Sequence, residues 1–445
     1  MSLLPDDILP DILSRLPVKS LLRFRCVSKS WLALISCPDF VKLHLSRSVQ
    51  IKNNLRLFLW EDNFYRVDFD PDEGVLQPAV VNNHPLNSCP VMTLIMELCH
   101  GNYDCGIMLY GSCDGLLCMS DANSINDFFI CNPSTRKSKK LPYESVELPD
   151  INNIFYDCIY RFGYDNTNDD YKVVRLAFRQ KTFRGDIDEY EVKVYSLKSN
   201  SWHRPEKFSQ CPKMGSFGDS IAGGALHWIS YVKTATPKKR LIVAFDLGTE
   251  KYRVIPQPKY AGPHFFLYLN NLGGCLSLSC QYESSVVEVF LLKEYGGENE
   301  HWSKLITISP TNPFVIFYTV KPITYSKCGM KVLLNINSSL IWYNLEQQSF
   351  EEVRVRGMED ITQVQTCLES LVSVDFPPAE QLLIKGVQVG AIVPTRTTNI
   401  NNEDVSEYIT NSKSGKKVLL EVDFHLVWYN SEQESFEEIR VDDID

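Results

Sequence analysis

The chain has 445 residues, of which 44% are hydrophobic and 22% charged, and its formal net charge is −10. This acidic balance disfavours a nucleic-acid-binding protein, which would carry a basic face. No apolar run reaches the length of about 18 residues that a membrane span requires. Asp6, Asp7 and Asp11 stand where a signal peptide would have a basic start and an apolar run. We therefore expect a cytoplasmic or nuclear protein with a large core and with neither nucleic acid nor membrane as a partner.

The first 47 residues predict three or four short helices. Pro5 followed by two aspartates favours a helix start, a second helix is expected from Pro17, and a third between Ser28 and Pro38. Pro10 interrupts the first of them, where an interior proline costs about 3 kcal/mol. We expect that segment to be kinked or to become regular only from Asp11. So small a module cannot bury all of its large apolar side chains, so part of its surface must meet a partner or another domain.

This segment resembles the F-box of plant proteins. The resemblance lies in Leu4–Ile8, Ile12–Pro17 and Arg25–Trp31, which match in register across about 40 residues. It implies binding to a Skp-type adaptor, and through the adaptor to the cullin and RING subunits of a ubiquitin ligase. The residues that the resemblance assigns to the adaptor surface are Leu4, Pro5, Ile8, Leu9, Ile12, Leu13, Leu16, Pro17, Leu21, Leu22, Val27 and Trp31. We expect Leu22 and Trp31 to contribute instead to the small internal core.

From about residue 50 the sequence changes to short β-branched and aromatic runs broken by turn residues. A hairpin pattern recurs that ends on Trp202, Tyr252, Trp302 and Phe350, at spacings of 50, 50 and 48 residues. A diglycine repeats at the same interval, at residues 223–224 and 273–274. This period is typical of kelch-like propeller blades, which bury their faces on one another. Dividing the residues between 54 and 375 by the period predicts about six blades, and we place this domain at 50–376.

These repeats also resemble the F-box-associated domain of plant F-box proteins. The matching segments are Cys131–Lys137, Phe162–Asp165, Asp170–Val174, Gly224–Trp228, Ala244–Leu247 and Leu272–Leu276. Residues 293–296 and 366–372 resemble the S-locus F-box group and its defence-related relatives. The subgroup would imply self-incompatibility, with a secreted-type ribonuclease as substrate, or defence, with an immune receptor or regulator as substrate.

The C-terminal region contains a tandem duplication. Residues 323–355 recur at 409–441, displaced by 86 and identical at 21 of 33 positions. We expect residues 370–376 to supply the strand that closes the ring, which leaves the copy as a half-blade outside it or inserted at an altered closure. The predicted chain is thus a small all-α F-box (1–47), an all-β kelch-like β-propeller (50–376), and a linker with a duplicated C-terminal β segment (377–445).

No motif in the sequence indicates catalysis or a bound metal or cofactor. The 14 cysteines include no Cys-x-x-Cys pair and no accompanying histidine cluster, so we interpret them as free thiols. Nucleotide-binding loops, serine-hydrolase elbows and zinc-protease motifs are absent from the sequence. Ubiquitin transfer would need a catalytic cysteine or a RING with paired zinc ligands, and neither is visible. The chain is expected to be a non-enzymatic subunit.

The resemblances favour a substrate-recognition subunit of a Skp-cullin-F-box ubiquitin ligase, whose propeller binds a protein substrate. The substrate would bind at loops on one face, of which the longer are 77–110, 143–160, 179–191, 205–219 and 232–240. Aromatic candidates for the substrate site are Tyr156, Tyr160, His264, Phe265 and Phe266, although burial in strands would explain them equally well. The alternatives are a propeller enzyme or glycan-binding propeller with the helical head as a structural cap, and a scaffold that binds the adaptor without delivering a substrate.

Overall fold

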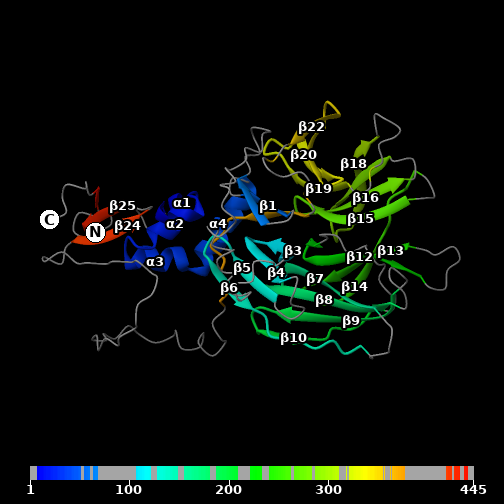
Figure 1. Cartoon of the computed structure of the whole chain (residues 1–445), viewed down its shortest axis with the longest axis horizontal. Coiled ribbons are helices and arrows are strands. Elements are labelled where there is room, and N and C mark those ends of the chain that lie inside the picture. The colour runs from blue at the N-terminus through cyan, green and yellow to red at the C-terminus, as the bar shows by residue number, and fades with distance from the viewer. Residues whose placement is uncertain are drawn as a thin grey trace. The chain divides into compact units, whose positions relative to one another are not determined.

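The computed structural model describes most of the chain (Figure 1), which divides into two compact units. One unit comprises Met1–Leu22 with Ala33–Pro378, and the other Arg23–Leu32 with Ala379–Asp445. The described residues are 8–51, 55–60, 64–68, 107–121, 128–148, 155–180, 187–208, 221–232, 240–261, 265–282, 286–309, 317, 320–353, 355, 361, 363–375, 417–422, 425–430 and 435–438.

The N-terminal residues form four helices: α1 (Ile8–Leu13), α2 (Val18–Phe24), α3 (Lys29–Ser36) and α4 (Pro38–Ile51). In the described chain α1 begins at Ile8, so the expectation of regular helix only from Asp11 was wrong. Pro10 lies in the first turn, where a backbone N–H has no intrahelical acceptor and its loss costs little. The carbonyl of Pro10 still accepts the N–H of Ser14 at 3.0 Å.

Twenty strands form five four-stranded antiparallel sheets, each ordered as in the chain. They are β3 (Ile107–Cys113), β4 (Leu116–Asp121), β5 (Phe128–Asn132) and β6 (Lys137–Lys140); β7 (Phe155–Asp165), β8 (Asp170–Gln180), β9 (Ile187–Ser196) and β10 (Ser201–His203); β11 (Ile221–Ala222), β12 (Ala225–Tyr231), β13 (Arg240–Asp246) and β14 (Tyr252–Ile255); β15 (Phe265–Leu272), β16 (Cys275–Tyr282), β17 (Val287–Lys293) and β18 (His301–Ile308); β19 (Val320–Tyr325), β20 (Lys331–Ile336), β21 (Ser339–Asn344) and β22 (Ser349–Val353).

The recurring aromatic residues identify one strand of each repeat. Trp202, Tyr252, Trp302 and Phe350 lie in β10, β14, β18 and β22, the last strands of four successive blades. Each diglycine forms the turn between the first two strands of its blade, and all four glycines have positive φ, between 57° and 86°. Glycine is favoured there because a Cβ would be strained in that conformation.

The ring is closed by strands from both ends of the propeller. β1 (Leu55–Trp60) pairs with β2 (Phe64–Asp68) on one side and with β23 (Gln363–Leu368) on the other. The first strands of neighbouring blades contact one another, and β23 contacts both β19 and β3. The predicted count of about six blades is therefore corrected to five four-stranded blades among the described residues, with a three-stranded sheet at the closure. Dividing length by period overcounted because it treated residues at the two ends of the domain as a complete blade.

The prediction that residues 370–376 supply the closing strand was wrong. Closure uses β23, and the residues after it pack along the first blade without joining a sheet. The side-chain amide of Asn132 donates to the carbonyls of Ser370 at 3.0 Å and Val372 at 2.8 Å, and Val374 is fully buried. The alternating apolar residues of this segment predicted a strand. Its backbone carbonyls instead accept hydrogen bonds from the buried side chain of Asn132, so the segment pairs with no neighbouring strand.

The core lies between neighbouring sheets. Between the second and third blades, Val174 and Phe178 pack with Trp228 and Phe245, and all four are almost fully buried. One helix joins this interior, because Val41 and Leu45 of α4 pack against the cluster between the first two blades. Lys42 of the same helix forms an ion pair of 2.7 Å with Asp169.

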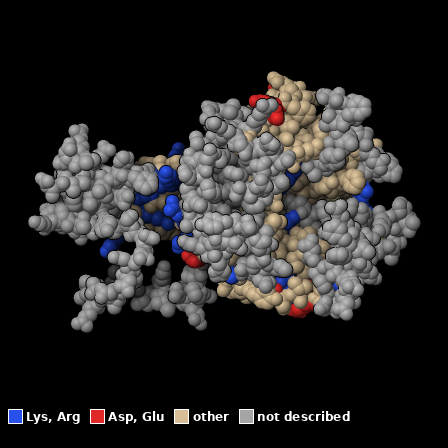
Figure 2. Space-filling view, in the orientation of Figure 1, with Lys and Arg blue, Asp and Glu red and all other residues tan. Residues whose placement is uncertain are grey.

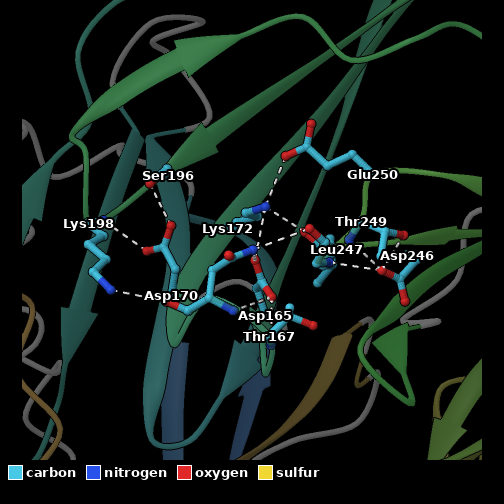
Figure 3. Close-up of polar contacts among 12 residues, drawn as sticks. Asp165, Thr167, Asp170, Lys172, Ser196, Lys198, Asp246, Leu247, Thr249 and Glu250 are labelled. Atoms are coloured by element: carbon cyan, nitrogen blue, oxygen red, sulfur yellow. Dashed lines mark hydrogen bonds and ion pairs between the residues drawn. The ribbon is translucent and has the colours of Figure 1, made fainter.

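A buried ammonium group also joins the second and third blades (Figure 3). The Nζ of Lys172 lies 3.0 Å from a carboxylate oxygen of Asp165 and 2.9 Å from one of Glu250, and it donates to the carbonyl of Leu247 at 2.5 Å. Burial lowers the pKa of Lys172, but hydrogen bonds to Glu250 and Asp165 outweigh that effect and raise it. Asp165 also accepts the backbone N–H groups of Thr167 and Asn168.

The duplicated segment forms β24 (Lys417–Val422), β25 (His425–Asn430) and β26 (Ser435–Glu438), a three-stranded antiparallel sheet. Among the described residues these strands pair only with one another. They therefore add no strand to the sheets of the ring.

We expect Lys172→Met to destabilise the propeller by about 3–5 kcal/mol, because it leaves the buried Asp165 carboxylate without its ion pair. Lys198→Met is the matched control, since the hydrogen bond from that ammonium to the carbonyl of Asn168 is exposed and should contribute less than about 1 kcal/mol. Urea unfolding measures the free energy of unfolding of both variants. Equal losses in the two variants would contradict the structural role assigned to Lys172.

Candidate functional site

The first and last helices of the N-terminal module are joined by an arginine. The guanidinium of Arg47 on α4 donates to the backbone carbonyl of Asp11 at 2.7 Å, to the hydroxyl of Ser14 and to the Asp11 carboxylate. Arg15 pairs with the same carboxylate at 2.8 Å. The hydrogen bond from Arg47 and, less strongly, the one from Arg15 hold the pKa of Asp11 below its ordinary value, although burial opposes them. α1 is thereby fixed against α4.

A histidine of α4 makes the second polar contact in this module. The ring of His44 is buried, its Nε2 lies 3.0 Å from the carbonyl of Leu16, and it stacks on Phe40 with ring centroids 6.5 Å apart. Burial lowers the pKa of His44, although the bond to the Leu16 carbonyl acts in the opposite direction. The neutral imidazole is therefore the form that the folded helices favour.

The predicted adaptor residues divide by exposure. Ile8 and Ile12 are 41% and 47% exposed and lie four residues apart, so they share one face of α1. Pro17 is exposed as well, whereas Leu13 and Leu21 are fully buried with Val18, Ile35 and Phe40. The remaining described members are half-buried: Leu9, Leu16, Leu22, Val27 and Trp31. Leu4 and Pro5 lie outside the described residues.

The internal core therefore differs from the expected one. Leu13 and Leu21 fill it, while Leu22 and Trp31, the predicted core residues, keep part of their surface. Trp31 packs edge-on against Phe24, with ring centroids 5.5 Å apart. Helical spacing alone could not decide this, because a helix of about two turns can direct either of two adjacent leucines inward.

Sequence reasoning missed several exposed apolar side chains of the helices. Leu32 of α3 and Leu43, Val49 and Ile51 of α4 are all exposed. They fall outside the matched motif segments, so the resemblance drew no attention to them. Leu32 stands in an apolar run whose inward and outward positions the sequence does not separate, and Leu43, Val49 and Ile51 lie beyond the last helix placed by the sequence analysis.

The helical module is also basic in an acidic chain. Residues 8–51 contain seven Lys and Arg residues against two Asp residues, although the whole chain carries −10. Figure 2 shows Lys and Arg side chains gathered over these helices. The module therefore attracts an acidic surface more strongly than the rest of the chain does.

The predicted substrate residues are not brought together among the described side chains. Tyr160 lies inside the propeller, with its ring centroid 3.9 Å from that of Phe128 and 5.2 Å from that of Tyr110. Burial raises the pKa of Tyr160 and leaves the side chain no surface for a substrate. Phe266 is 57% exposed on β15 and remains a candidate. His264 and the side chains of Tyr156 and Phe265 lie outside the described residues.

The segment after β6 presents two apolar side chains that the sequence analysis did not single out. Tyr143 is 66% exposed and Val146 is 41% exposed, inside the interval 143–160 that was predicted to be a long loop. Their backbone is held firmly: the guanidinium of Arg175 donates to the carbonyls of Glu144 at 2.5 Å and Ser145 at 2.8 Å. These two side chains are thus displayed on a fixed segment.

The cations that hold this segment are themselves paired. Arg175 binds Glu191 at 2.9 Å within the sheet, and Lys193 binds Glu147 at 2.7 Å and the carbonyl of Ser145 at 3.1 Å. The described part of the chain contains no group of three or more His, Cys, Asp or Glu residues suited to a metal ion. None of its helices is long and apolar enough to cross a membrane.

Comparison with known proteins gives matches over both regions. The model of the F-box domain matches residues 1–43, and the model of the F-box associated beta propeller domain matches residues 81–376. F-box protein CPR1 of Arabidopsis thaliana is 32% identical over 395 residues, which cover 84% of this chain and 89% of that protein. An F-box/kelch-repeat protein of the same plant is 27% identical over 386 residues, 83% of this chain and 95% of the relative.

We expect the helices to lose stability as the pH falls below about 6.5. Because burial lowers the pKa of His44, the unfolded state binds a proton more readily, so the contribution of the neutral ring is complete above pH 6.5 and decreases below it, by up to about 1.4 kcal/mol per pH unit.

The helical far-UV circular dichroism signal during urea unfolding, recorded between about pH 7.5 and 5.5, measures this slope. His44→Gln should flatten the slope, and His301→Gln, which changes an exposed histidine, should leave it unchanged. A wild-type slope of zero, or equal slopes in wild type and His44→Gln, would rule out this role.

Proposed function

Because the chain belongs to the F-box proteins that carry an F-box associated β-propeller domain, we propose that it is a substrate-recognition subunit of a Skp-cullin-F-box ubiquitin ligase. The helical module binds a Skp-type adaptor, and the adaptor connects it to the cullin and RING subunits. The propeller binds a protein substrate. The narrower assignment to the S-locus or defence-related group rests on residues 293–296 and 366–372 and remains a proposal.

The observation that carries the proposal is the exposed apolar face of α1 in a segment that matches the F-box. Ile8 and Ile12 lie on one face and are each more than two-fifths exposed, while the neighbouring Leu13 is buried. Large apolar side chains exposed together on a small helical module are typical of a protein-binding surface. Burying them on a partner would supply the central anchors of an interface.

The chain acts without transferring ubiquitin itself. A subunit that holds a substrate and an adaptor at once raises the effective concentration of the substrate near the transferring subunits. The fixed segment that displays Tyr143 and Val146 and the exposed Phe266 are candidate contacts for that substrate. Tyr160 is buried and offers a substrate no contact surface.

Co-purification of the full chain with a recombinant Skp-type adaptor tests the proposal. Ile8→Asp with Ile12→Asp should weaken binding at least 10-fold, because two charges replace the apolar anchors of α1. Phe266→Asp is the matched control: it places a charge at an exposed aromatic position of the propeller and should leave adaptor binding unchanged. If wild type fails to bind, or the α1 variant binds as well as wild type, the helical module is not an adaptor-binding surface.

The basic charge of the helices predicts how association depends on salt. The rate constant for association should fall several-fold between about 50 and 300 mM salt, while the dissociation rate changes little, because screening acts on encounter. Lys29→Gln with Arg15→Gln should reduce that dependence. Stopped-flow measurement with the adaptor gives both rates, and an association rate that is independent of salt would contradict an acidic partner face.

A further inference from the structure

The duplicated C-terminal sheet reproduces part of a blade strand by strand. β24 pairs with β25 from Lys417↔Asn430 to Val422↔His425. β20 pairs with β21 from Lys331↔Asn344 to Ile336↔Ser339, which is the same register displaced by 86 residues. The pairing of β25 with β26 repeats that of β21 with β22 in the same way. The C-terminal sheet therefore has the backbone arrangement of the last three strands of the β19–β22 blade.

The described strands of the copy include no counterpart of β19, the strand that begins that blade. In the ring, β19 pairs with β20 through five residue pairs and contacts β15 and β23, so it joins the blade to the neighbouring sheets. The duplicated sequence starts at Ile323, in the middle of β19, and Val320–Pro322 have no counterpart, since Ser406–Tyr408 occupy that place. Among the described residues β24 pairs with β25 alone, whereas its counterpart β20 lies between β19 and β21.

The copy keeps the residue types that the ring buries at this position. In the blade the large side chains facing the core are almost fully buried, and six of them have identical residues in the copy. They are Val332, Leu333, Leu334, Leu340, Trp342 and Tyr343, and their counterparts are Val418, Leu419, Leu420, Leu426, Trp428 and Tyr429. The copied strands therefore have the volumes and the register that the space beside β19 requires.

We propose that β24–β26 can take the place of β20–β22 beside β19 of the same chain, so that this blade has two alternative forms. Residues 376–416 connect the ring to the copy, and an extended chain of that length spans up to roughly 140 Å. In the alternative form residues 326–362 leave the ring, β19 pairs with β24 in place of β20, and β23 keeps its pairing with β1. The inference does not depend on the proposed function.

One difference makes the original strands the major form. Asn335 is buried, and its neutral amide donates to the carbonyl of Ile361 at 3.2 Å. Its counterpart Glu421 would bring a charged carboxylate to that buried position, which costs free energy unless the charge is paired. Exchange should therefore become visible when the original blade is weakened.

A double-mutant cycle in the full chain tests the exchange. Trp428→Ala alone should leave the melting temperature of the propeller unchanged, because the copy is not in the ring. Trp342→Ala alone should lower it only moderately, because the copy with its intact tryptophan replaces the damaged strands. The melting temperature of the double variant should fall by roughly 5 °C or more beyond the sum of the two single decreases. If Trp342→Ala already shows the whole loss of the double variant, the proposal is overturned.

Hydrogen exchange of the Trp342→Ala protein shows directly which set of strands occupies the blade. Peptides covering 331–344 should lose protection, and peptides covering 417–430 should gain it up to the level of the ring. Protection of 417–430 equal to that in wild type overturns the proposal. Leu340→Ala and Leu426→Ala form a second matched pair and should give the same pattern, so that a tryptophan variant that fails to fold does not decide the question.

Dilution identifies which chain supplies the copy. Protection of 417–430 in the Trp342→Ala protein should be independent of protein concentration, since the copy and β19 belong to one chain. Protection that disappears on dilution would mean that a second molecule supplies the strands, and it would overturn the assignment to the same chain.

Discussion

The pairing of β1 with β23 is the constraint on which the propeller depends. It joins residues more than 300 positions apart in the chain, so every blade between them must be in place before the ring can close. Contacts of this separation in sequence are slow to form, because loop-closure entropy precedes any gain from pairing. Closure is reinforced by side chains on either side of β23: Arg56 pairs with Glu369 at 3.2 Å, and buried Asn132 binds the backbone that follows.

The junctions between blades combine apolar packing with a few buried polar groups. Lys172 reaches from the second blade to the backbone and the carboxylate of the third, and Tyr295 of the fourth blade meets His227 of the third at 2.7 Å. Apolar faces alone would leave the sheets free to slide, whereas these groups are satisfied in one register only. Such pairs need not add net stability over apolar residues, but breaking one leaves an uncompensated buried group. They fix the order and spacing of the sheets.

The sequence predicted those parts of the fold that repeat locally. Trp202, Tyr252, Trp302 and Phe350 marked the last strands of four blades, because an aromatic after a tight turn recurs wherever the same hairpin recurs. The number of blades and the closing strand depend on pairing between distant segments, which periodicity does not report. The adaptor surface was predicted as a set, but its division into core and surface was not, because Leu13 and Leu21 turn inward only once four short helices pack together. Tyr143 and Val146 carried no signal, since their exposure follows from Arg175 binding the backbone between them.

The contacts of α4 connect the two halves of the proposed receptor. Arg47 fixes α1, which displays Ile8 and Ile12, to one side of this helix, while Val41 and Leu45 insert into the cluster between the first two blades. The path from the α1 face to the propeller therefore runs through packed side chains and hydrogen bonds of α4. A receptor that works by proximity depends on such a connection, since freedom between its two binding surfaces would lower the effective concentration that it creates. Weakening the Arg47 contact should thus impair delivery of a substrate more than it impairs binding of either partner alone.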